Sequence, residues 1–152
     1  MNYERYDPLL FSSNLLEFTF KSTGPKGEIT KVVQFAETDN IEIYNLAFGD
    51  LLPDGRVDDH IKNDNKDRNK ILATVAAAVY EFTARYPEKF VFFTGSTSDR
   101  TRLYRMAITT NLSELTKDFE IFGVNSENEY YYPEVFQKGK DYIGFLVKRK
   151  FV

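Results

Sequence analysis

Apolar and polar side chains alternate in three short runs within the first fifty residues, and turn-forming residues separate these runs. In the first run, Leu15–Lys21, the apolar side chains of Leu16, Phe18 and Phe20 fall on one face of an extended chain. A period of two indicates a strand with one buried face. The segment Gly24–Gly27 (Gly-Pro-Lys-Gly) then predicts a turn.

The next two runs continue this pattern. Residues Glu28–Ala36 form a second predicted strand, in which Lys31 interrupts an otherwise apolar face. A turn at Thr38–Asn40 leads into a third predicted strand, Ile41–Phe48. Three consecutive strands with short connections favour an antiparallel meander.

Helical spacing replaces the strand period after a long polar loop. Apolar residues recur every three or four positions from Ile71 to Tyr86, with Asp67 as the expected N-cap and Pro87 after the last turn. The run Lys89–Thr94 is apolar on both faces, which is typical of a central strand covered on two sides.

The rest of the chain predicts a helix from about Ser98, a short helical turn at Leu112–Lys117, a strand ending near Val124 and a last strand at Tyr142–Val147. The expected order is β-β-β-α-β-α-β-β. We therefore expect an α+β fold with a mainly antiparallel sheet and two principal helices packed on it, and one domain over residues 1–152.

Composition excludes several kinds of chemistry. The chain has no cysteine and one histidine, which excludes disulfides, thiolate zinc sites and cysteine nucleophiles. A formal net charge of −3 argues against a dedicated duplex-DNA binder. There is no apolar stretch of membrane-spanning length and no signal-peptide pattern, so we expect a cytoplasmic protein with no membrane partner.

The junction between the central strand and the helix that follows it is the main candidate ligand site. Backbone amides at a helix N-terminus attract anions, and arginine side chains bind phosphate or carboxylate groups. We expect these groups to hold a phosphate-bearing ligand, and the residues concerned are Gly95, Ser96, Thr97, Ser98, Arg100, Arg102 and Arg105. The alternative is structural: the hydroxyl groups cap the helix, and the arginines are solvated or paired with acids.

The polar loop from Gly49 to Asp67 supplies the candidate catalytic residues, Asp58, Asp59 and His60. A carboxylate or an imidazole in such a loop has the chemistry of a general acid or base. The alternative is a solvated acidic loop, because its spacing does not match a calcium-binding loop. No metal site is predicted. The chain also lacks the GxxxxGK[ST] and GxGxxG patterns, so no cofactor is expected.

Five segments resemble a family of small uncharacterised bacterial proteins that carry a domain of unknown function. They are FKSTGPKGEITKVVQF (20–35), YNLAFGD (44–50), NKILATVAAAVYEFT (69–83), GSTSDRTRLYRMAI (95–108) and FLVKRK (145–150). The GST-x-x-RTRLYR part is the most specific. The resemblance implies a bacterial, stand-alone cytoplasmic protein, and its small size suggests a component of a toxin–antitoxin or defence system.

Two functional hypotheses follow from the sequence. In the first, the chain binds RNA or a nucleotide at the Gly95–Arg105 junction, with Asp58 or Asp59 in reserve as an acid or base. In the second, the chain is a non-catalytic interaction module whose sheet edges and tyrosines, including Tyr130–Tyr132, bind a small protein partner or a second copy. The sequence does not decide whether the protein is an enzyme.

Overall fold

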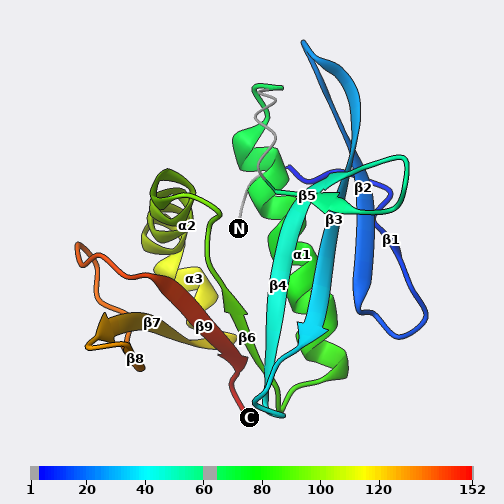
Figure 1. Ribbon diagram of the computed structural model, residues 1–152. Coiled ribbons are helices and arrows are strands. Elements are labelled where there is room, and N and C mark those ends of the chain that lie inside the picture. Colours follow the sequence, from blue (N-terminus) through cyan, green and yellow to red (C-terminus); the bar gives the residue numbers. More distant parts are fainter. Residues whose placement is uncertain (1–3, 60–64, 152) are drawn as a thin grey trace. The chain divides into compact units, whose positions relative to one another are not determined.

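The computed structural model describes residues 4–59 and 65–151. These residues form two compact units (Figure 1). The first unit combines the chain up to Ala36 with Leu46–Arg85, and the second combines Glu37–Asn45 with the chain from Tyr86 onward. The chain therefore passes from one unit to the other more than once.

The first unit contains a sheet and one long helix. Its elements are β1 (Leu10–Phe11), β2 (Glu17–Gly24), β3 (Gly27–Glu37), the second part of β4 (Ile43–Leu51), β5 (Val57–Asp58) and α1 (Arg68–Arg85). Strand β2 pairs antiparallel with both β1 and β3, and β5 pairs antiparallel with β4. Figure 1 shows α1 lying along one face of these strands.

Aromatic side chains fill the space between α1 and the sheet. The rings of Phe35 on β3 and Phe82 on α1 stack with centroids 4.1 Å apart, and the Phe18 ring meets Phe35 edge-on at 5.9 Å. Phe18 and Phe82 are fully buried. The apolar faces of the first strand and of the helix, both predicted from periodicity, thus pack together as the core of this unit.

The second unit is built around β6 (Phe90–Phe93). Residues Ile43–Asn45 of β4 pair with it in parallel, and β9 (Gly144–Arg149) pairs with it antiparallel on the other side. Beyond β9 follow β7 (Phe119–Glu127) and β8 (Tyr130–Val135), both antiparallel to their neighbours. Helices α2 (Ser98–Thr110) and α3 (Leu112–Leu115) connect β6 to β7.

The predicted α+β class and the mainly antiparallel sheet are confirmed, and the expected central strand does have a neighbour on each side. The sequence missed three strands. Strands β1 and β5 have only two residues each, too few to show a period. Strand β8 carries three consecutive tyrosines and Pro133, a pattern without alternation. The sequence also did not predict that β4 and β6 run parallel.

The predicted polar loop after Phe48 was too long. Strand β4 continues through Asp50 to Leu51, and Val57 and Asp58 return to pair with these two residues. The Lys31 side chain explains why a charged residue occurs at position 50, as described below. None of the helices in the described part of the chain has the length and apolar character of a membrane span.

Candidate functional site

The junction between β6 and α2 has the local structure that the sequence predicted. Strand β6 ends at Phe93 and α2 begins at Ser98. Thr97 is the N-cap, since its backbone is extended and its hydroxyl accepts a hydrogen bond from the Arg100 amide at 3.2 Å. One of the backbone donors expected to bind an anion is therefore satisfied within the helix.

Gly95 allows the first turn of α2 to lie directly against the end of the strand. A β-carbon at this position would collide with the backbone of Arg100 and Thr101. The Gly95 amide donates to the Thr101 hydroxyl at 3.1 Å. The first turn of the helix thus occupies the space on the side where a Gly95 side chain would project.

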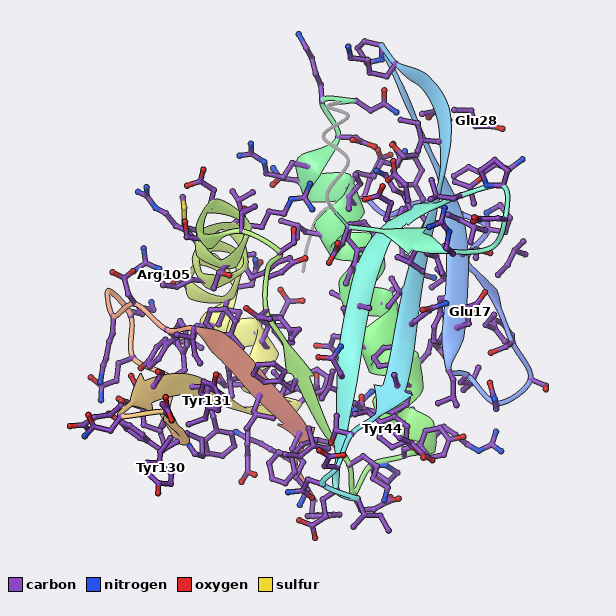
Figure 2. All side chains as sticks on the ribbon, in the orientation of Figure 1. Glu17, Glu28, Tyr44, Arg105, Tyr130 and Tyr131 are labelled. Carbon is purple, nitrogen blue, oxygen red and sulfur yellow. The ribbon has the colours of Figure 1, made fainter. Side chains whose placement is uncertain are left out.

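The three arginines of this region have different surroundings. The Arg100 guanidinium donates to the Ser96 hydroxyl at 2.8 Å, so these two predicted residues do lie together beside Gly95. The Arg105 guanidinium lies 3.1 Å from the carboxylate of Asp141 on the β8–β9 connection. Figure 2 shows Arg105 on the side of α2 next to that connection. Arg102 is exposed and has no ion pair among the described residues.

The acidic loop contributes to a buried ion pair that the sequence did not predict. The Lys31 ammonium lies 2.5 Å from the Asp50 carboxylate, and both side chains are less than a tenth exposed. The strand register places Asp58 directly opposite Asp50. A lysine on the apolar face of a strand requires such a carboxylate, and this was the signal available in the sequence.

The remaining candidates of that loop are Asp58, Asp59 and His60. Asp58 and Asp59 are half-buried at the end of β5, and His60 lies outside the described residues. Within residues 4–59 and 65–151, no group of three or more histidine, aspartate or glutamate side chains is arranged to hold a metal ion. A role of Asp58 or Asp59 as an acid or base stays a prediction.

Tyr44, within the YNLAFGD segment, has a shifted pKa. Burial, and next the negative charge of Glu37, raise the pKa of Tyr44 above its usual 10.0. Its ring lies near that of Tyr86, with centroids 6.3 Å apart. The hydroxyl group therefore stays protonated at neutral pH, which suits a structural tyrosine better than a nucleophile.

Strands β7 and β8 form a hairpin, Phe119–Val135, that we call the tyrosine hairpin. Strand β8 is the last in the strand order, so its outer edge faces no other described strand. The tyrosines Tyr130, Tyr131 and Tyr132 are 77%, 72% and 43% exposed, and Val135 is 70% exposed. Figure 2 shows Tyr130 and Tyr131 on this hairpin. The tyrosines that the sequence proposed for protein binding thus form an edge of the sheet.

Glu134 holds the base of the tyrosine hairpin in place. Its carboxylate accepts hydrogen bonds from the side chains of Lys140 at 2.5 Å, Asn125 at 2.6 Å and Gln137 at 3.1 Å. The hydrogen bond from Lys140 is the main cause that lowers the pKa of Glu134 below 4.5. The same bond raises the pKa of Lys140 above 10.5. This network joins β7, β8 and the connection to β9.

Aromatic side chains that follow β8 in the chain also pack against the tyrosine hairpin. The rings of Phe136, Tyr142 and Phe145 lie within 6.2 Å of one another, measured between centroids. The Tyr142 ring packs directly over Gly123 of β7, where a β-carbon would collide with it. The exposed tyrosines are therefore mounted on a well-packed base rather than on a free loop.

The comparisons with known proteins give one match. A family model described as "Family of unknown function (DUF6934)" matches residues 2–150. No curated protein and no solved structure matches the chain. The match confirms the expectation of a family of unknown function. The GST-x-x-RTRLYR motif and a bacterial source stay predictions.

Proposed function

This chain belongs to the family of unknown function DUF6934, and we propose that it is a non-catalytic module that binds a protein partner through the tyrosine hairpin. The observation that carries the proposal is the exposure of Tyr130, Tyr131 and Val135 on the outermost strand. Tyrosine is enriched in protein interfaces, where its rigid ring contributes a large contact area. Tyr130 projects from one face of this edge strand, and Tyr131 and Val135 project from the other. Exposed apolar side chains on an edge strand are a common mark of an interaction site.

The base of the hairpin also supports a binding role. A surface that is already ordered loses less conformational entropy when a partner binds. The Glu134 network and the ring of Tyr142 over Gly123 hold both strands in place. The tyrosines are thus presented in a fixed arrangement before the partner arrives.

The test begins with the protein purified from the cells that encode it. We expect native mass spectrometry to find a stoichiometric protein partner, which is then identified and purified. A Tyr130→Ser/Tyr131→Ser double variant should weaken binding of that purified partner by at least about tenfold, as at interface hot spots. Ile41→Ser is the matched control, because Ile41 is 82% exposed and lies outside the hairpin.

Two outcomes would contradict this proposal. One is recovery of the bare chain alone from its own cells. The other is a partner whose affinity is the same for the double tyrosine variant and the wild type. A component of a toxin–antitoxin or defence system would need a stoichiometric partner, so the same experiment addresses that prediction.

A second candidate function is the binding of a phosphate-bearing ligand, RNA or a nucleotide, at the Gly95–Arg105 junction. Arg102 favours it, because this exposed guanidinium has no ion pair among the described residues and lies in the early part of α2. The positive end of the helix dipole and the neighbouring Arg100 would add to the attraction for phosphate.

This candidate makes a distinct prediction. Nucleotide or RNA affinity, measured by filter binding, should fall steeply as salt rises. Arg102→Ala should weaken binding without lowering the melting temperature. Lys117→Ala is the control: it removes another exposed cation of the same unit and should leave the binding affinity unchanged. Failure to bind nucleotides or single-stranded RNA at low salt would exclude this candidate.

A further inference from the structure

The tyrosine hairpin carries a strong negative charge. Residues 119–135 include four glutamates and no lysine or arginine. Glu134 is paired with Lys140, but Glu127 and Glu129 are exposed and have no ion pair among the described residues. Two uncompensated carboxylates therefore lie close to Tyr130 in the sequence, near the tip of the hairpin.

The strand register brings one of these carboxylates next to a tyrosine ring. Glu127 of β7 lies directly opposite Tyr130 of β8. Side chains of directly opposite residues project from the same face of a sheet, with β-carbons about 4.5–5.5 Å apart. An exposed carboxylate and an exposed ring thus stand side by side near the tip of the hairpin, where Asn128 and Glu129 make the turn with positive φ angles.

This pair has the chemistry of an arginine-binding site. A guanidinium group stacks on an aromatic face and can donate two parallel hydrogen bonds to a carboxylate. A lysine ammonium is strongly hydrated and lacks the planar fork, so it would fit less well. A phosphate group would be repelled by the glutamates, which argues against RNA on this surface although tyrosines can stack on bases.

The outer edge of β8 is poorly suited to main-chain pairing. The Phe136 amide donates to the Ile121 carbonyl at 3.0 Å. Because the direction of the backbone hydrogen bonds alternates along a strand, the N–H groups of even-numbered residues of β8 point toward β7. The backbone groups of odd-numbered residues point toward the outer edge. Pro133 occupies the middle outward position and has no N–H group. A partner strand would therefore meet a missing donor in the centre of the edge. Recognition should depend on side chains.

We propose that the tyrosine hairpin binds an arginine-bearing segment of its protein partner, with one arginine stacked on Tyr130 and paired with Glu127. This inference rests on the proposed function, since it names the chemistry of the partner at the same site. Pairing of the hairpins of two copies of the chain is disfavoured, because both hairpins have the same negative charge.

The experiment uses the full chain and three fluorescent peptides that differ only in their charged residue: arginine, lysine or glutamate, spaced by glycine and serine. Fluorescence anisotropy should give the tightest binding for the arginine peptide, about fivefold tighter than the lysine peptide, and none for the glutamate peptide. The affinity for the arginine peptide should fall as salt rises.

Matched variants test the ring and the charge one at a time. At position 130 they distinguish the aromatic ring from its hydroxyl group, and at position 127 they remove the negative charge while keeping the size of the side chain. Tyr130→Phe should bind like the wild type, because the aromatic face is kept. Tyr130→Ser should lose about tenfold in affinity, and Glu127→Gln about fivefold with a weaker salt dependence. Glu42→Gln, which neutralises an exposed carboxylate outside the hairpin, should have no effect. Unchanged melting curves would confirm that all variants are folded.

Several outcomes would overturn the inference: equal binding of the three peptides, wild-type affinity of Tyr130→Ser, or self-association of the chain that Tyr130→Ser abolishes. These failures are distinguishable from failure of the proposed function. If the purified natural partner still depends on Tyr130 and Tyr131 while the arginine peptide does not bind, the interaction module stands and only the assigned chemistry is wrong.

Discussion

Single residues in this chain have roles that their types alone do not reveal. Lys31 is buried, where a lysine is costly unless it is paired, and Asp50 supplies the pair at 2.5 Å. Arg105, by contrast, belongs to a group predicted to bind a ligand and makes an ion pair with Asp141. Whether a charge binds a partner or the protein itself depends on which strand or loop lies beside it.

The buried ion pair gives a stability prediction. Lys31→Met leaves the Asp50 carboxylate buried without its cation, and should lower the free energy of unfolding by about 3–5 kcal/mol. The double variant Lys31→Met/Asp50→Leu should recover most of this loss, because neither charge is then buried. Urea denaturation measures both values.

The control for this pair is Lys21→Met, which removes the cation of the exposed Lys21–Glu28 pair. Its effect should stay below about 1 kcal/mol. If Lys31→Met/Asp50→Leu were less stable than Lys31→Met, Asp50 would stabilise the fold mainly through contacts other than its ion pair with Lys31.

Glu134 gives a prediction of pH dependence. Its pKa in the folded protein is lowered below 4.5, so its contribution to stability is complete above pH 4.5 and is lost as the pH falls through the folded-state pKa. Glu134→Gln should therefore melt at a lower temperature than the wild type at neutral pH, and the difference should shrink below pH 4.5. Glu120→Gln, on the same hairpin, is the control. A difference that does not change with pH would contradict this account.

At the scale of elements, the sequence predicted those that are long and periodic. The alternation around Phe18 and Phe20, the helical stripe ending near Arg85 and the apolar run of β6 each gave the right element. Strands β1 and β5 were missed because pairing with a neighbour, not an intrinsic pattern, makes two residues into a strand.

In the candidate site too, features set by adjacent residues were predictable and features set by distant residues were not. Local rules narrowed the N-cap to Thr97 or Ser98, because capping depends on adjacent residues, and the structure has Thr97. The partner of Arg105 comes from a loop 36 positions later in the chain, and no local pattern identifies it. The exposure of Tyr130 follows from the strand order, which is a property of the whole sheet.

The start of α2 can be tested as an element. Thr97→Ala removes the hydroxyl that accepts from the Arg100 amide and should cost about 1 kcal/mol of stability, with an upper limit of about 2 kcal/mol. Thr97→Ser keeps an equivalent oxygen and should cost much less. Thermal melting followed by circular dichroism measures both, and equal losses would show that the methyl group, not the cap, is what stabilises this turn.

At the scale of the whole molecule, the two compact units are not consecutive along the chain. The segment Glu37–Asn45 of the second unit interrupts the first, and β4 begins in one unit and ends in the other. We predict that the chain unfolds as a single domain, because β4 cannot unfold in one unit without disturbing the other.

Hydrogen exchange monitored by mass spectrometry in increasing urea tests this prediction. Buried amides of β3 and β9, one strand from each unit, should exchange with the same free energy of opening. The destabilising variant Lys31→Met, in the first unit, should lower both by the same amount. Loss of protection confined to β3 would instead show that the units open independently.

The course of β4 also limits how such a gene can be divided. A break after Arg85 would leave Ile43–Asn45 on the leading fragment, although these residues are the parallel neighbour of β6 on the trailing one. No single cut releases either half with all its strands. Recombination at one point therefore cannot transplant one half into another protein, and the two halves are expected to be inherited together.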